Sequence, residues 1–277
     1  MENKPLVSVY ITTRNRHILL DRAIQSVLTQ TWGNLELIVC DDASSDDTSR
    51  LLQKYSDELP NFYWIRNDTM AGACVSRNNA INKATGEFIT GLDDDDYFLP
   101  QRIELLMEAY KDEYAFVCST YYRKTHERTT IVKDGVGVIG LNDVLHYNKI
   151  GNQVLTKTQR LKDVGGFDVL LPSFQDYDVW VRLLKKFGKS LKIKKPLYVF
   201  DISHTNERIS GSNDRVQRGY EIFVKKHQAI MNKKHIQSMR LLEQVIKNRP
   251  MKLSDAIRFC NTGNYKSVIS NLLKSNE

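Results

Sequence analysis

Short apolar runs and helical patterns alternate through the first 120 residues, and this alternation restricts the fold more than any other feature. A strand, a helix and a further strand are typical of βαβ units, which build a parallel sheet with helices on both faces. Strands are expected at 6–12, 35–40, 62–66, 87–92 and 115–120, and helices at 18–28, 73–84 and 102–110. Ligands bind such sheets at the carboxyl ends of the strands, so functional residues should follow the strands.

The pattern becomes less regular after residue 120 and then purely helical. Residues 121–200 contain strand-like segments at 153–158 and 197–202 and an amphipathic helix at 177–187. From about residue 212 onward only helical spacing is visible. We therefore predict an α/β domain with a C-terminal helical appendage, with boundaries at 1–205 (halves 1–120 and 121–205) and 206–277.

The charge is distributed unevenly along the chain. Residues 1–200 hold 26 basic and 26 acidic side chains, whereas residues 201–277 hold 14 basic and 7 acidic ones. The whole formal charge of +7 therefore lies in the last 77 residues. A basic region of this kind predicts an anionic partner, namely nucleic acid, a phosphate-bearing substrate or an acidic membrane face. A solvated helical face is the alternative interpretation.

The chain carries no sign of a membrane span, a secretion signal or a disulfide framework. No apolar stretch approaches the ~20 residues that a spanning helix needs, and the first residues lack an apolar signal core. The four cysteines are scattered without a CxxC pair, which argues against a zinc clip as well. We expect a soluble, cytoplasmic protein.

Two acidic clusters follow predicted strands. Residues 41–48 read DDASSDDT, which offers more side chains than the single one that an N-cap requires. A carboxylate directly after the strand could accept the imide N–H of a uracil ring. Residues 93–96 are four consecutive aspartates, whose mutual repulsion favours a bound cation. Mg²⁺ and Mn²⁺ prefer carboxylate oxygens and retain waters and substrate phosphates, so a metal site is predicted here.

The ordered set of motifs over roughly residues 5–205 resembles that of family 2 glycosyltransferases. The similar segments, in chain order, are VSVYITTRNR at 7–16, AIQSVLTQT at 23–31, DDASSDDT at 41–48, GACVSRNNAIN at 72–82, the aspartates at 93–96, GGFD at 165–168 and QDYDVWVRL at 175–183. Each motif is weak alone, but the set at this spacing is specific. The resemblance implies a GT-A fold with a mostly parallel central sheet, a nucleotide-diphosphate sugar and a divalent metal.

The resemblance also implies roles for individual residues. Nucleotide-sugar binding would fall to Thr12 and Asp42 at the uracil, Arg77 on the nucleotide side, Asp93, and Asp94 near the ribose. Asp93-x-Asp95 resembles the DxD motif, with Asp95 as ligand of Mn²⁺ or Mg²⁺. Asp176 matches the catalytic base, with Gln175 in place of a frequent glutamate. Losing that like charge should keep Asp176 ionised more readily.

Two further features have competing interpretations. His204 follows a strand where related enzymes often carry a metal- or diphosphate-binding loop, although a lone histidine is more often structural. Residues 135–140 fit GxGxxG, the dinucleotide fingerprint, but they come too late in the chain for a first βα turn. A glycine-rich loop beside the acceptor cleft is the preferred interpretation.

The sequence predicts an inverting, metal-dependent hexosyltransferase that uses a UDP-sugar. The expected acceptor is a glycan or a polyprenyl-diphosphate-linked saccharide in O-antigen, capsule or lipooligosaccharide synthesis, with the basic region on the inner membrane face. Apolar positions of that region, Ile222, Phe223, Ile230 and Met231, would enter the membrane interface. The rivals are a nucleotidyltransferase, which should carry a glycine-rich triphosphate loop after the first strand, and a nucleic-acid-binding module, which should interleave aromatic and basic residues. Neither pattern is evident, so no nucleic-acid partner is expected.

Overall fold

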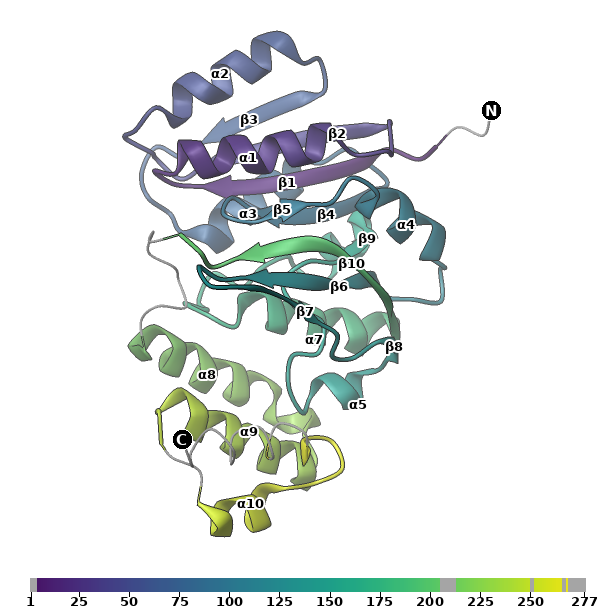
Figure 1. Ribbon diagram of the computed structural model, residues 1–277, viewed down its shortest axis with the longest axis vertical. Helices are drawn as coiled ribbons and strands as arrows, with labels where there is room; N and C mark the ends of the chain where they lie inside the picture. The colour runs from purple at the N-terminus through teal and green to yellow at the C-terminus, as the bar shows by residue number, and fades with distance from the viewer. Residues whose placement is uncertain (1–3, 205–212, 250–251, 266–267, 269–277) are drawn as a thin grey trace.

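The protein is an α/β molecule with one central sheet, seen in a computed structural model that describes residues 4–204, 213–249, 252–265 and 268 (Figure 1). The first half of the sheet contains β1 (Val7–Thr13), β2 (Leu35–Asp41), β3 (Phe62–Arg66) and β4 (Phe88–Asp93). These strands run parallel in the order β3-β2-β1-β4, as the βαβ pattern predicts. The helices that connect and flank them are α1 (His17–Leu28), α2 (Thr48–Glu58), α3 (Ala73–Lys83) and α4 (Arg102–Ala109).

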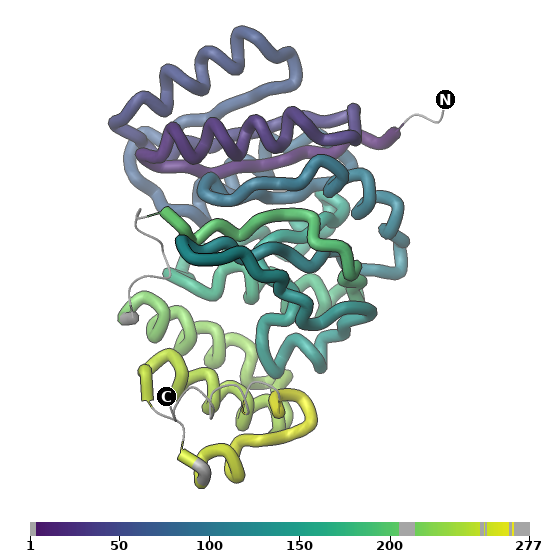
Figure 2. Tube along the Cα trace, in the orientation of Figure 1, coloured from purple at the N-terminus to yellow at the C-terminus, as the bar shows by residue number. Residues whose placement is uncertain are grey.

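The second half of the sheet is mixed. Its strands are β5 (Tyr97–Phe98), β6 (Val117–Lys124), β7 (Thr129–Val132), β8 (Gly137–Ile139), β9 (Leu155–Lys157) and β10 (Ser190–Asp201). β9 lies antiparallel between β4 and β6, whereas β6 and β10 pair in parallel despite their distance in sequence. The expected α/β fold with a mostly parallel central sheet and C-terminal helices is therefore confirmed, and Figure 2 shows β6 and β10 side by side.

The remaining helices follow the same chain path. They are α5 (Leu141–Val144), α6 (Thr158–Asp163), α7 (Gln175–Phe187), α8 (Asn213–His227), η2 (Gln228–Ile230), α9 (Lys233–Ile246) and α10 (Leu253–Phe259). No helix in the described ranges is long and apolar enough to cross a membrane. The domain boundary expected between 205 and 206 lies outside the described residues, and the division into domains stays a prediction.

Strands β1, β2 and β4 bury side chains on both faces of the sheet. Along β1, Val9 and Ile11 point into the core with α1 and α2, while Tyr10 points into the core with α3 and α7. Successive side chains of a strand face opposite ways, so both cores need apolar residues at adjacent positions. This explains why these strands read as continuous apolar runs.

The glycine-rich segment at 135–140 forms a turn and a short strand of the sheet instead of a nucleotide-binding turn. Its central residues form β8, which pairs antiparallel with β10. Gly135 has a φ of 71° and Gly137 a φ of 102°, values that L side chains rarely adopt. The glycines therefore serve the turn between β7 and β8, and the dinucleotide interpretation is wrong.

Helix α8 packs into the core of the molecule. Phe223 has no exposed surface and stacks on Tyr177 of α7, with 4.3 Å between ring centroids. The partly buried Ile222, Ile230 and Met231 pack against the same core. The expectation that these four side chains enter a membrane interface is wrong, because α7 already covers the apolar face of α8.

Removing the Phe223 ring should destabilise the protein strongly. Phe223→Ala is expected to lower the free energy of unfolding by about 3–5 kcal/mol, because a buried ring leaves a cavity. Urea unfolding followed by circular dichroism measures the change. Lys225→Ala on the exposed side of the same helix is the control, with an expected change within about 0.5 kcal/mol. Equal stability of the two variants would contradict the packing of α8 on α7.

Candidate active site

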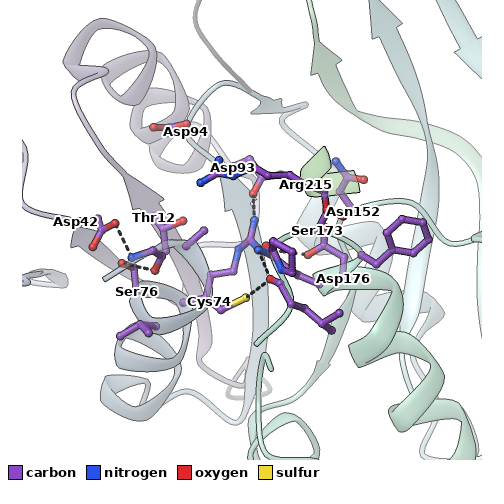
Figure 3. Close-up of a pocket in the computed structure, with 18 of the residues that line it drawn as sticks. Thr12, Asp42, Cys74, Ser76, Asp93, Asp94, Asn152, Ser173, Asp176 and Arg215 are labelled. Carbon is purple, nitrogen blue, oxygen red and sulfur yellow. Dashed lines mark hydrogen bonds and ion pairs between the residues drawn. The ribbon is translucent and has the colours of Figure 1, made fainter. Parts of the chain in front are cut away.

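A cleft of about 1410 Å³ opens at the carboxyl ends of the parallel strands and reaches the first turn of α7. Seven of the eight residues singled out from the sequence line it: Thr12, Asp42, Arg77, Asp93, Asp94, Asp95 and Asp176. Figure 3 shows Asp42, Thr12 and Ser76 at one end and Asp176, Ser173 and Asn152 at the other. The eighth residue, His204, contacts Asp95 with 3.2 Å between Nε2 and Oδ2. The fold therefore brings the predicted set together.

The Asp42 carboxylate is held in place by three donors. The backbone N–H groups of Ala71 and Gly72 donate to it at 2.7 and 2.9 Å, and the Asn67 amide donates at 2.8 Å. Burial alone would raise the pKa of Asp42, but these hydrogen bonds outweigh it and lower the pKa below its usual value. Asp42 is thus a fixed, ionised acceptor at the end of β2.

The four consecutive aspartates point toward different elements of the fold. Asp93 accepts a hydrogen bond from Arg77 at 2.8 Å, and Asp94 accepts one from Thr13 at 2.8 Å. Asp95 faces His204, and Asp96 accepts the backbone N–H of Asp201 at 2.9 Å. Arg77, Arg16 and one backbone donor offset part of the negative charge of the loop, and the bound cation stays a prediction.

Arg16, a residue that the motif analysis missed, lies between two of these aspartates. Its Nη1 is 3.0 Å from Asp94 Oδ1 and 3.3 Å from Asp95 Oδ2. Burial raises the pKa of Asp94 to about 6, and Arg16 opposes that rise. The available sequence signal was a second basic residue two positions after Arg14, immediately beyond the first strand.

The groups around Asp95 fit a divalent metal ion whose remaining ligands come from water and substrate. In the ranges that the structure describes, no group of three or more His, Cys, Asp or Glu side chains gathers to hold a metal. Asp95 and His204 nevertheless present an oxygen and a nitrogen to one another at 3.2 Å. Mg²⁺ and Mn²⁺ are commonly held by one or two protein ligands together with water and substrate phosphate oxygens. Asp95 and His204 fit such a partial site.

Arg77 links the acidic loop to α7. The residue is 8% exposed, and its guanidinium donates to Asp93 and to the Gln175 amide oxygen, each at 2.8 Å. The Nη1 atom of Arg77, which donates to Gln175, also lies 3.7 Å from Asp176 Oδ1. The contact of Arg77 with the nucleotide stays a prediction. Gln175 therefore orients Arg77, which sequence reasoning did not foresee.

Asp176 lies in the first turn of α7, which begins at Gln175 and not at Tyr177 as the spacing had suggested. Phe174, immediately before the helix, adopts a left-handed φ of 64°, which turns the chain into α7. Burial raises the pKa of Asp176 to about 7; Arg77 opposes the rise and Asp93 adds to it. A carboxyl that titrates near neutral pH, with 24% of its side chain exposed, suits proton transfer.

The family follows from a sequence comparison over more than half of the chain. The family model described as "Glycosyl transferase family 2" matches residues 8–166. The chain belongs to this family. Glycosyltransferase activity is thereby supported over both rival functions, the nucleotidyltransferase and the nucleic-acid-binding module.

Similar proteins include bacterial glycosyltransferases. WcaA of Escherichia coli strain K12, named for colanic acid biosynthesis, is 36% identical over 240 residues, which cover 82% of this chain and 83% of WcaA. WfaP of Escherichia coli, named as a UDP-Glc:alpha-D-GlcNAc-diphosphoundecaprenol beta-1,3-glucosyltransferase, is 31% identical over 65% of this chain and 71% of its own.

Solved structures share the fold. The mannosyltransferase PcManGT of Pyrobaculum calidifontis, solved with GDP-Man and Mn²⁺, has a TM-score of 0.66 and 15% identity. The match covers 99% of this chain and 76% of that one. At this identity the likeness shows the fold alone, and it extends through the C-terminal helices.

Proposed function

We propose that this protein transfers a sugar from a UDP-sugar to a hydroxyl of a glycan or polyprenyl-diphosphate-linked acceptor, with inversion, in bacterial surface polysaccharide synthesis. The names of WcaA and WfaP support the pathway class and the UDP-linked donor. The observation that carries the proposal is the cleft that joins the fixed carboxylate of Asp42 to Asp176 in the first turn of α7.

Asp42 is proposed to accept the N3–H of the uracil ring, with Thr12 beside it. An ionised carboxylate with fixed geometry accepts a hydrogen bond from that N–H well, whereas cytosine presents an acceptor at the same ring position. Asp42 would therefore bind UDP and reject CDP, because an unpaired buried acceptor costs binding energy. Asp94, close to Thr13, would lie nearer the ribose, and Asp93 with Arg77 nearer the transferred sugar.

Asp42→Ala should weaken UDP binding by about 10- to 100-fold and remove the preference for UDP over CDP. Isothermal titration with each nucleotide measures both quantities. Asp47→Ala is the matched control, since Asp47 is an exposed aspartate of the same acidic run outside the cleft. Unchanged discrimination between UDP and CDP in Asp42→Ala would remove Asp42 from the uracil site.

Asp176 is proposed as the general base. It accepts the proton of the acceptor hydroxyl while that oxygen forms a bond to the anomeric carbon and the bond to UDP breaks. The electron pair leaves with UDP, so one displacement inverts the anomeric centre. Arg77 holds Asp176 and Asp93 in a fixed arrangement beside this reaction. A positioned base of this kind contributes about 10²–10⁴-fold to the rate.

Asp95 and His204 are proposed to hold a divalent ion, Mn²⁺ or Mg²⁺. PcManGT, which shares the fold and was solved with Mn²⁺, supports this cofactor class. When bound, such an ion supplies Lewis-acid stabilisation to the leaving diphosphate. Arg16 would then keep its contact with Asp94 and balance the charge that remains on the acidic loop.

The basic C-terminal helices are proposed to hold the enzyme beside an anionic membrane surface on the cytoplasmic side. Charge alone would carry this contact, since the apolar side chains of α8 are buried. Deleting α8 would open the core, so replacement of exposed basic residues of α9 and of its C-cap is the sharper test. Arg240 and Lys247 changed to Gln should reduce co-sedimentation with anionic vesicles and leave neutral vesicles unaffected. Equal binding to both vesicle types would contradict the proposal.

The decisive experiment is a donor panel. The full chain with Mn²⁺ and a lipid-linked N-acetylglucosaminyl diphosphate is expected to release UDP from one UDP-sugar and to form a glycosidic bond of inverted configuration, read by NMR. Absence of UDP release with every UDP-sugar, or retention of configuration, would overturn the proposed function.

A further inference from the structure

The end of the cleft beside Asp176 contains a cation from the C-terminal region. Arg215 lies near the start of α8, its side chain is exposed, and it lines the same cleft as Asp176. Figure 3 shows it with Asn152 and Ser173, away from Asp42. The positive end of the α8 dipole lies at the same place. Helix α8 therefore brings positive charge to the acceptor end of the cleft.

Arg215 differs from the other arginines of the cleft in its partners. Arg16 and Arg77 are paired with aspartates, and Arg14 contacts the Met70 sulfur on the Asp42 side. In the described part of the chain no carboxylate pairs with the Arg215 guanidinium. Asp134, which also lines the cleft, interacts with Tyr147 instead. Arg215 is thus a cation whose charge the cleft does not neutralise.

The backbone of Arg215 is fixed relative to Asp176. Ser173, three residues before Asp176, donates its hydroxyl to the Arg215 carbonyl at 3.2 Å. Gly219, one turn further along α8, approaches so closely that a Cβ there would overlap Ser173 Oγ. Only glycine permits this contact. The helix that carries Arg215 and the loop that leads to Asp176 are therefore held together as one unit.

We propose that Arg215 binds a phosphate group of the acceptor close to the hydroxyl that Asp176 deprotonates. This inference rests on the proposed function and adds the acceptor class to it. A guanidinium binds phosphate oxygens in a bidentate manner, which orients the ligand as well as attracting it. The phosphate would belong to the acceptor, because the proposed function puts the donor nucleotide at the Asp42 end. A lipid diphosphate and a phosphodiester of a growing polymer share this chemistry.

The test is a binding measurement that needs no knowledge of the accepting sugar. The full chain, saturated with UDP and Mn²⁺ so that the donor site is filled, is titrated with farnesyl diphosphate, farnesol and methyl glucosyl phosphate, a phosphodiester. At least one of the two anionic probes should bind more tightly than farnesol. Arg215→Gln should weaken the binding of that anion by about 10- to 100-fold, and Arg215→Lys should weaken it by less. Whichever anion depends on Arg215 identifies the source of the phosphate.

Arg218→Gln is the matched control, because Arg218 is exposed on the same helix and does not line the cleft. It should bind every probe as the wild type does. Arg215→Gln that binds both anions with wild-type affinity would overturn the inference, and so would a wild type that prefers neither anion to farnesol. UDP release from a UDP-sugar, measured on the same wild-type preparation without added UDP, tests the proposed function separately.

Discussion

Asp176→Asn is expected to reduce turnover by about 10²–10⁴-fold with little change in donor affinity. The amide retains the size of the carboxyl but cannot accept the proton of the acceptor hydroxyl. Donor affinity should persist because Asp42, the proposed uracil-binding residue, lies at the opposite end of the cleft from Asp176. Steady-state UDP release measures turnover, and titration with UDP measures donor affinity.

The pH profile of the wild type gives an independent view of the same residue. A base with a pKa near 7 is protonated at low pH, so turnover should rise through about pH 7 and then level off. This ascending limb should be absent from the residual activity of Asp176→Asn. Asp163→Asn, an aspartate at the end of α6 outside the cleft, is the control and should keep the wild-type profile. Equal losses of UDP affinity and turnover in Asp176→Asn would assign Asp176 to the donor site.

The raised pKa of Asp176 also has a consequence for stability. Its carboxyl binds a proton more tightly in the folded than in the unfolded protein, so folding is penalised once the pH rises from about 4 through 7. Asp176→Asn removes the charge and the penalty. The variant should therefore melt at a higher temperature than the wild type at pH 8, and the gap should narrow toward pH 4. A more stable and less active variant is the signature of a strained catalytic group.

The sequence predicted the parallel half of the sheet well because burial on both faces leaves a strong local pattern. Strands β1 to β4 were expected within one or two residues of their ends, and the polar clusters after them converge in one cleft. Parallel strands bring their carboxyl ends to a common edge, so position along the chain translated directly into position in space.

The second half of the sheet was harder to predict because its strands break the usual pattern. The first seven residues of β10, 190–196, include three lysines and a proline, which read as a loop. Lys192 is nevertheless only 2% exposed, since its amine donates to the carbonyl oxygen of Lys149 at 2.7 Å. Register shifts around Pro196 then accommodate the proline. Such compensation depends on distant backbone groups that no local pattern reveals.

The acidic loop shows a second limit of sequence reasoning. Four adjacent aspartates suggested one joint role, but the chain turns sharply there and points them at different elements. Similarly, the apolar spacing of α8 suited either a membrane surface or a protein core. Only the aromatic stacking of Phe223 on Tyr177 decided between these two interpretations. In both cases the directions of the side chains depend on tertiary structure, which a local pattern does not reveal.

Asp95→Ala is expected to abolish transfer and the Mn²⁺-dependent part of UDP binding, while the fold remains intact. The carboxylate of Asp95 faces His204 and contacts Arg16. In the alanine variant Arg16 keeps its ion pair with Asp94. Turnover and UDP affinity, each measured with Mn²⁺ and with EDTA, separate the metal-dependent part from the rest. Full wild-type activity in EDTA would contradict metal dependence altogether.

Asp96→Asn distinguishes a specific ligand from the bulk negative charge of the loop. It removes one charge from the same run, yet its amide oxygen can still accept the N–H of Asp201. If Asp95 is the ligand, Asp96→Asn should keep the Mn²⁺ requirement of the wild type. Equal losses of Mn²⁺-dependent activity in Asp95→Ala and Asp96→Asn would mean that the loop acts through its total charge. If His204 shares the ion with Asp95 as proposed, His204→Gln should raise the Mn²⁺ concentration needed for half-maximal activity. An unchanged requirement would leave His204 as a structural partner of Asp95 alone.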